Sequence, residues 1–97
     1  METKVVRTQV KAIQSRFFEA LDVLIDSGKV GGGLKAFCEK YELHRPKYSN
    51  IRTYVKDENK PGTGYKFIDI DALAYLVRDY GISADWLLLG RGGMFSK

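Results

Sequence analysis

The amino-acid sequence predicts one all-α domain, a bundle of five helices. Apolar residues recur at spacings of three and four along most of the chain, which is the pattern of helices with one buried face. Glycine, proline or serine stands where most of these runs begin or end. With 97 residues, of which 44% are hydrophobic, the chain is long enough for one core but too short for two domains.

The first helix is predicted by an apolar stripe that includes Phe17 and Leu24. Gly28 follows at the place where a left-handed residue would end this helix. Residues 1–13 are assigned to an N-terminal extension, and the domain itself is assigned to residues 14–97.

The second and third helices are expected to be short. The glycines before Leu34 disfavour helix, so the second helix should begin near Gly33 or Leu34. Pro46 suits the first turn of a third helix, because its φ is fixed and its missing N–H is not needed there. Tyr48 and Ile51 would face inward from this helix.

A loop is expected over residues 57–64, where charged residues are followed by proline and glycine. Residues 65–70 are open to two interpretations: a short strand paired with residues 4–8, or an extended lead-in to the fourth helix. Asp69 or Asp71 can cap that helix.

The fourth helix is expected to bury one apolar stripe and to end at Gly81. The stripe comprises Ile70, Leu73, Ala74, Val77 and Tyr80. Ser83 is placed to cap a short fifth helix over residues 84–89. After that helix, Met94 and Phe95 are placed to pack back onto the domain.

Positive charge is concentrated in one stretch of the chain. The chain has 16 basic and 12 acidic side chains, for a net charge of +4 at pH 7. Residues 45–66 hold six basic and two acidic side chains, so this stretch alone also sums to +4. Localised positive charge indicates an anionic partner, although a solvated basic face without a partner gives the same count.

Other classes of site find no support in the sequence. No stretch approaches the roughly 18–20 apolar residues of a membrane span, and residues 1–13 do not resemble a signal peptide. The single cysteine, Cys38, and the single histidine, His44, make neither a disulfide nor a metal site. We therefore expect a cytoplasmic protein that is not an enzyme, with no cofactor, no metal and no small-molecule ligand.

Residues 34–51 fit the apolar pattern of a helix-turn-helix, in which two short helices pack at a fixed angle. The buried positions of that pattern fall on Phe37, Tyr41, Leu43, Tyr48 and Ile51. Cys38 supplies the small side chain needed where the helices touch. The turn position, commonly a glycine with left-handed backbone, is Glu42. A non-glycine residue in that conformation costs on the order of 1 kcal/mol, so either the turn differs or packing compensates.

Two stretches carry a resemblance to a known family. Residues 37–45 (FCEKYELHR) match the second helix and turn, and residues 80–92 (YGISADWLLLGRG) resemble the ending of many bacterial regulators of that family. Over residues 16–95 the chain thus resembles the phage-repressor family (Cro/CI-like, XRE-type). This resemblance implies a lambda-repressor-like five-helix fold whose third helix is the recognition helix. The chain departs from the family pattern at Glu42, at Pro46 and in a longer loop after the third helix.

The resemblance implies that the start of the third helix binds the major groove of double-stranded DNA. The positions carried over as base contacts are His44, Arg45, Lys47, Ser49, Asn50 and Thr53. Arg45 and Lys47 can donate to guanine edges, and Asn50 has the amide geometry for adenine. Phosphate contacts, which position a protein without reading sequence, are expected from Lys35, Arg52 and Lys56.

The sequence therefore predicts a repressor-like, sequence-specific transcriptional regulator, of the kind found in bacteria and phages. The resemblance implies a homodimer on paired half-sites, with recognition helices about 34 Å apart. The N-terminal segment, with Val5, Val6 and Val10, is the first candidate for the dimer surface. The alternative is a protein-interaction adaptor or antitoxin-like module that keeps the fold without specific DNA binding.

Overall fold

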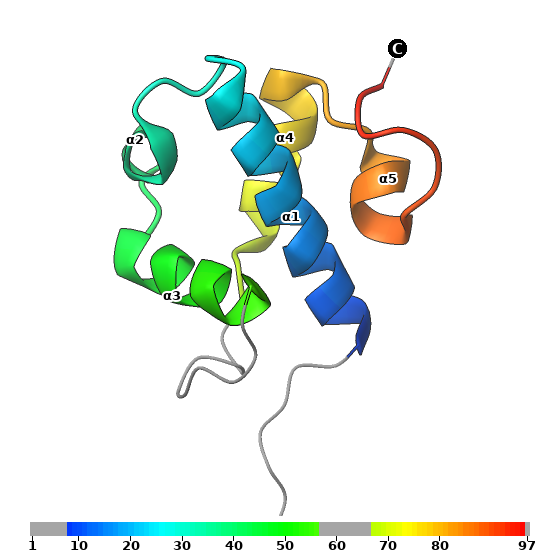
Figure 1. The fold of residues 1–97 in the computed structure, drawn as a ribbon, viewed down its shortest axis with the longest axis horizontal. Helices are drawn as coiled ribbons and strands as arrows, with labels where there is room; N and C mark the ends of the chain where they lie inside the picture. The colour runs from blue at the N-terminus through cyan, green and yellow to red at the C-terminus, as the bar shows by residue number, and fades with distance from the viewer. Residues whose placement is uncertain (1–7, 57–66, 97) are drawn as a thin grey trace, which may run out of the picture.

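The helices that the sequence predicts are present in a computed structural model, which describes residues 8–56 and 67–96 of the chain. They are α1 (Thr8–Asp26), α2 (Gly33–Tyr41), α3 (Arg45–Lys56), α4 (Ile70–Tyr80) and α5 (Ala84–Leu89) (Figure 1). No strand occurs within the described ranges, so the prediction of an all-α fold with five helices is confirmed. The lambda-repressor-like type of the bundle stays a prediction.

Helix α1 is the longest helix and runs through the middle of the molecule, in contact with each of the other four (Figure 1). It already includes Thr8, so α1 begins within the stretch that the sequence assigns to the N-terminal extension. The reason is that Val10, Ile13 and Gln14 continue the helical period of the stripe, and Gln14 is buried. Residues 1–7, with Val5 and Val6, lie outside the described ranges.

The core is centred on an aromatic cluster that joins α1 to α2 and α3. The ring centroid of Phe17 lies 5.0 Å from that of Phe18, 6.0 Å from Phe37 and 6.1 Å from Tyr48. These separations and tilted planes are the arrangement that aromatic rings prefer. All four side chains are almost completely buried, so α2 and α3 are held against α1 by close packing.

The inward face of α4 differs from the predicted one. Ala72 and Leu76 are fully buried, whereas Ile70 is 87% exposed and Ala74 is also exposed. Leu73, Val77 and Tyr80, also in the predicted stripe, are only partly buried. The helix thus turns a narrow face of small and branched side chains to the core and leaves its most apolar stripe at the edge of the core.

The segment before α4 is an extended lead-in. Phe67, Ile68 and Asp69 form no strand, and the backbone of Asp69 is extended at the helix N-cap. The Asp69 side chain does not cap α4, because it is bonded to α3 instead. The predicted loop 57–64 and the predicted pairing with residues 4–8 lie, except for Thr8, outside the described ranges.

The C-terminal part of the domain folds back as expected. The Ser83 hydroxyl accepts a hydrogen bond from the Trp86 N–H (3.2 Å) and so caps α5. Ser83 N–H donates to the Met94 carbonyl (2.7 Å), and Ile82 bridges to Phe95. At the other end of α5, the guanidinium of Arg16 donates to the carbonyls of Leu87 (2.8 Å) and Leu88 (3.1 Å). None of the described helices has both the length and the apolar content to cross a membrane.

Candidate nucleic-acid interface

The turn between α2 and α3 is short and has a left-handed backbone. Three residues, 42–44, separate the two helices. Glu42 has a left-handed backbone (φ 58°, ψ 44°), the only non-glycine residue with positive φ in the described part of the chain. The predicted departure from glycine therefore does not change the turn.

Hydrogen bonds and packing offset the cost of this conformation. The Glu42 N–H donates to the carbonyls of Cys38 and Glu39, and the Leu43 N–H donates to the Cys38 carbonyl at 2.8 Å. These bonds satisfy carbonyls at the end of α2 that would otherwise lack a partner. Leu43 then packs against the core, which fixes the direction in which α3 begins.

Cys38 occupies the contact between the two helices, as the sequence predicts. Its side chain is 1% exposed and lies in the same buried cluster as Tyr48 and Ile51 of α3. Burial raises the pKa of the Cys38 thiol, and the positive charge of Arg45 acts in the opposite direction. The thiol is therefore a small core group.

One face at the start of α3 is exposed and polar. His44 forms the N-terminal boundary of the helix, where its carbonyl accepts from the Tyr48 N–H at 3.2 Å. Arg45 and Asn50 are exposed, as is the His44 side chain. Within residues 8–56 and 67–96, these three side chains have no hydrogen-bond or ion-pair partner, so their donors face solvent.

Two hydroxyl residues, Ser49 and Thr53, continue this face by one and two helical turns beyond Arg45. Thr53 is exposed, and its hydroxyl donates to the Ser49 carbonyl at 3.0 Å. Ser49 is half-buried. The structure thus gathers five of the six predicted base-contact residues on or beside one exposed face, which we call the α3 face: His44, Arg45, Ser49, Asn50 and Thr53.

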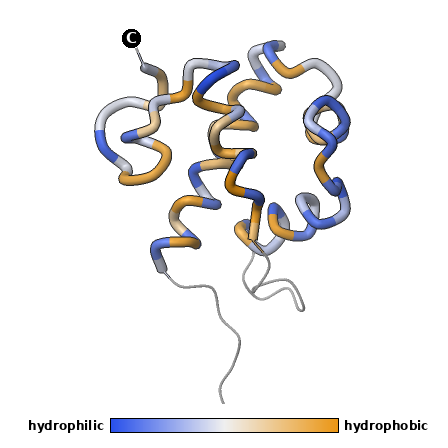
Figure 2. The backbone as a smooth tube through the Cα atoms, turned by 180° about the vertical axis from the view of Figure 1, so that it is seen from behind, coloured by the Kyte–Doolittle hydropathy of each residue, from blue (hydrophilic) through white to orange (hydrophobic). Residues whose placement is uncertain are grey.

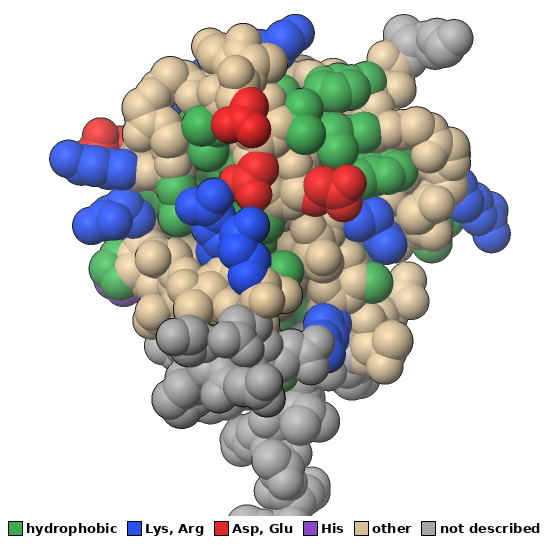
Figure 3. Space-filling model, viewed as in Figure 1, with side chains coloured by type: hydrophobic (Ala, Val, Ile, Leu, Met, Phe, Trp, Pro, Cys, Tyr) green, Lys and Arg blue, Asp and Glu red, His purple; other side chains and the backbone are tan. Residues whose placement is uncertain are grey.

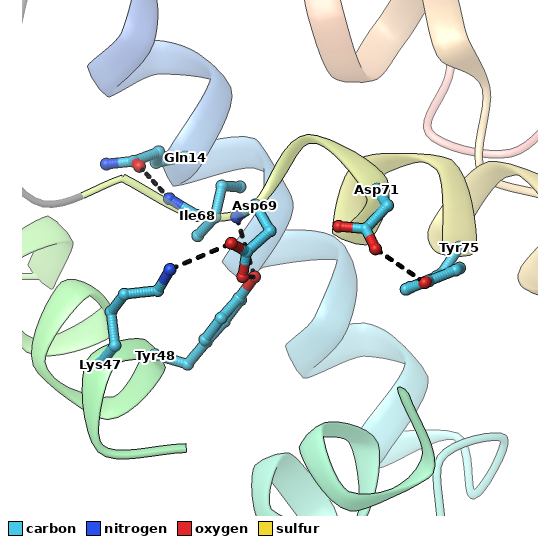
Figure 4. A network of polar contacts seen from close by, with 7 residues as sticks. All are labelled: Gln14, Lys47, Tyr48, Ile68, Asp69, Asp71 and Tyr75. Atoms are coloured by element: carbon cyan, nitrogen blue, oxygen red, sulfur yellow. Dashed lines mark hydrogen bonds and ion pairs between the residues drawn. The ribbon is translucent and has the colours of Figure 1, made fainter. Parts of the chain in front are cut away.

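Lys47, the sixth, is directed elsewhere. Its ammonium lies 3.1 Å from the Asp69 carboxylate, and its side chain is only 26% exposed. The same carboxylate accepts from the Tyr48 hydroxyl at 2.7 Å, and that hydroxyl accepts from the Asp69 N–H at 2.9 Å (Figure 4). The Tyr48 hydroxyl and Lys47 hold the pKa of Asp69 below its usual value. Lys47 therefore ties α3 to the segment before α4.

Gln14 strengthens the same attachment from α1. Its buried side-chain carbonyl accepts from the Ile68 N–H at 2.9 Å (Figure 4). The segment 67–69 is thus held by α1 on one side and by α3 on the other. Burial is the largest cause that raises the pKa of the Tyr48 phenol far above its usual value, so the phenol stays protonated and donates to Asp69.

Two of the three predicted phosphate contacts are also in ion pairs. Asp22 of α1 accepts from the Arg52 guanidinium at 2.5 Å and from the Lys56 ammonium at 3.2 Å. Figure 3 shows basic and acidic side chains side by side on this surface rather than a continuous basic patch. Lys35, the third, is exposed in the first turn of α2 and has no such partner in the described part of the chain.

Sequence reasoning missed the acidic partners of these basic residues. Asp22 lies 30 residues before Arg52, and Asp69 lies 22 residues after Lys47. Neither separation matches the spacing of residues that meet within one helix or turn. The pairs therefore become visible only when α1 and residues 67–69 are packed against α3.

Comparisons with protein-family models, with curated proteins and with solved structures found no match to this chain. Among the described residues, no group of three or more histidine, cysteine, aspartate or glutamate side chains is placed to hold a metal ion.

Proposed function

We propose that this protein is a repressor-like transcriptional regulator that binds specific double-stranded DNA sequences with α3 in the major groove. The observation that carries the proposal is the three-residue turn with left-handed Glu42, which presents an exposed helix start. There the side chains of His44, Arg45 and Asn50 have no partner among the described residues. A helix-turn-helix protein reads bases with the N-terminal residues of its second helix. In this proposal the protein is not an enzyme and acts in the cytoplasm.

Base reading rests on the α3 face. Arg45 is suited to a guanine edge and Asn50 to an adenine edge, since each offers the bidentate geometry for that base. His44 lies at the end of the helix that enters the groove first. Ser49 and Thr53 supply short hydroxyl contacts to bases or phosphates.

The ion pairs change the roles of the other basic residues. Lys47 positions α3 through its ion pair with Asp69 and is not proposed to read bases. If Lys47 turned toward DNA, the Asp69 carboxylate, which also accepts from Tyr48, would lose its cationic partner. Arg52 and Lys56 are paired with the Asp22 carboxylate, so a phosphate must exchange for that carboxylate before either residue can contact DNA. Lys35 is the phosphate contact that needs no such exchange.

Site selection followed by substitution tests this proposal. A randomised duplex library is enriched on the full-length protein, and Kd is measured for the selected site and for a scrambled site. Arg45→Ala is expected to weaken binding to the selected site by about 1–3 kcal/mol and to reduce the preference over the scrambled site. Arg91→Ala is the matched control, since Arg91 is an exposed arginine of the C-terminal segment. Equal effects of the two substitutions would remove α3 as the reading helix.

The regulator is proposed to act as a homodimer. One domain of this size makes few base contacts, and two recognition helices about one DNA turn apart read a two-part site. A selected site that consists of two related halves is the expected outcome. A single, asymmetric short site would contradict the homodimer while leaving DNA reading intact.

A second candidate function is favoured by the ion pairs themselves. Because Lys47, Arg52 and Lys56 are paired with Asp69 and Asp22, fewer positive charges are available to DNA than the sequence indicates. A protein-interaction adaptor or antitoxin-like module would tolerate this neutralisation. Absence of binding to any duplex at about 50 mM salt, where phosphate contacts are strong, would favour this candidate.

A further inference from the structure

An apolar surface is formed by the start of α1, by α4 with the segment before it, and by α5. We call it the apolar face; its residues are Val10, Ile13, Phe67, Ile70, Leu73, Ala74, Val77 and Leu88. Ile70 is 87% exposed, Phe67 51% and Leu88 40%. The side of the molecule seen in Figure 2 shows hydrophobic segments along α4. The largest apolar patch of a protein surface often marks a site of interaction with another molecule.

Two hollows flank Ile70 on this face. One, of about 280 Å³, is lined by residues from α1 and from the segment before α4, including Val10, Ile13 and Phe67. The other, of about 360 Å³, lies between α4 and α5 and includes Val77 and Leu88. Ile70 and Leu73 line both hollows. The face therefore offers one protruding side chain between two apolar depressions.

The lining of both hollows carries no charged side chain among the described residues. Among the residues that line the two hollows, only Gln14 has a polar side chain, and its side-chain carbonyl already accepts a hydrogen bond from the Ile68 N–H. Charged peptides and anionic lipid headgroups thus find no partner inside the hollows. The chemistry that fits is another apolar surface with a side chain to insert.

The exposed apolar area can supply a large part of the apolar surface that a dimer interface buries. At roughly 150–200 Å² for a fully exposed side chain of this size, Phe67, Ile70 and Leu88 leave on the order of 300 Å² in water. A standard interface buries about 800 Å² per partner, about 60% of it apolar. These three side chains supply more than half of that apolar share, and the half-buried residues between them add to it.

We infer that the apolar face is the surface on which a second copy of this chain docks, with α4 packed against α4 across a twofold axis. Residues 70, 73, 74 and 77 lie one and two turns apart on α4, the spacing of a helix–helix contact. Each Ile70 enters a hollow of the partner, and the twofold axis repeats that contact. No residue of α3 lines either hollow, so the dimer leaves the α3 face free. The inference rests on the homodimer of the proposed function and names its surface.

Sedimentation equilibrium of the full-length chain, over about 1–100 µM, tests this inference. Wild type is expected at twice the protomer mass in this range. Ile70→Asp is expected to raise the dimer dissociation constant tenfold or more, because it places a charge in an apolar hollow. Ala74→Arg acts independently, because it adds bulk and charge at an exposed position. Both positions are exposed on a helix, so far-UV circular dichroism is expected to match wild type.

Val23→Lys is the matched control, since Val23 is an exposed apolar residue of α1 that lines neither hollow. It is expected to leave the dimer intact. A dimer that survives both Ile70→Asp and Ala74→Arg overturns the inference, and so does a wild type that is monomeric throughout. A monomeric wild type that floats with phosphatidylcholine vesicles, while Ile70→Asp does not, would assign the face to lipid instead.

DNA binding is measured in parallel so that the two proposals fail separately. If the wild-type dimer is abolished by Ile70→Asp but no duplex binds either protein, the dimer surface stands and the proposed DNA function does not. If specific DNA binding is found with a monomeric wild type, the dimer surface is wrong and the DNA function stands.

Discussion

Asp22 of α1 and Arg52 of α3 form an ion pair with 2.5 Å between carboxylate and guanidinium, and the same carboxylate also holds Lys56 at 3.2 Å. Part of the positive charge of α3 is in this way neutralised by an acidic residue of α1, the helix on which α3 packs. The positive charge available to an anionic partner is therefore set by the tertiary structure as well as by the composition of α3.

Replacement of this carboxylate is expected to strengthen DNA binding. Asp22→Asn releases Arg52 and Lys56 for phosphate contacts, so the slope of log K against log salt should become steeper by about 1–2. Fluorescence anisotropy with a labelled random-sequence duplex, repeated over a series of salt concentrations, measures both the affinity and the slope.

Asp26→Asn is the control for net charge alone. Asp26 is exposed one turn further along α1 and holds no basic residue of α3. If both substitutions changed the slope equally, the effect would come from total charge, and the masking of Arg52 and Lys56 would be wrong.

The Tyr48 hydroxyl is expected to contribute measurably to stability. It donates to the Asp69 carboxylate and accepts from the Asp69 N–H, in a side chain that is fully buried. Tyr48→Phe should lower the free energy of unfolding by about 1–3 kcal/mol, because both groups lose a partner. Tyr75→Phe removes an exposed hydroxyl bond to Asp71 and should cost less than about 0.5 kcal/mol in the same urea titration. Equal costs would show that the buried bonds are not stabilising.

The stability contributed by Asp69 should depend on pH. The hydrogen bond from Tyr48 and the nearby Lys47 lower the pKa of Asp69 in the folded protein, so its contribution is present above the unfolded pKa of about 3.9. That contribution is lost as pH falls through the lower folded value. The difference in unfolding free energy between wild type and Asp69→Asn should therefore shrink as pH falls from about 5 to about 3. A difference that is constant with pH would contradict this assignment.

Because Glu42 has a left-handed backbone, the stability of the protein should depend on which residue occupies this position. Glycine adopts this backbone without steric cost, whereas a β-branched side chain is strained there. Glu42→Val should destabilise the protein by about 1–3 kcal/mol, and Glu42→Gly should be neutral or slightly stabilising. Urea unfolding measures the free energy of unfolding of the two variants. A Glu42→Val variant more stable than Glu42→Gly would show that the turn has another conformation.

Local patterns in the sequence predict the helices well, because helix formation and capping depend on neighbouring residues. The end of α4 at Gly81, the Ser83 cap and the small Cys38 at the helix contact were all predicted in this way. Helix α1 begins at Thr8, before the predicted apolar stripe, because Val10 and Ile13 continue its helical period.

The role of an apolar stripe is less predictable than its existence. Ile70 and Ala74 belong to a regular stripe, but periodicity does not say whether the stripe faces the core or a second molecule. Likewise, the sequence marks Lys47 and Arg52 as basic without indicating that Asp69 and Asp22 reach them. In both cases the missing information is the packing of elements far apart in the chain.

Binding of α3 in the major groove of DNA requires phosphate contacts, so it can be tested by the salt dependence of binding to a random-sequence duplex. We expect a slope of log K against log salt of about −3 to −5 per protomer, from roughly three to six phosphate contacts. Such a slope that becomes shallower by about 0.9 in Lys35→Ala, but not in Arg91→Ala, would support docking of α2 and α3 on DNA. No binding of wild type at about 50 mM salt would contradict the claim.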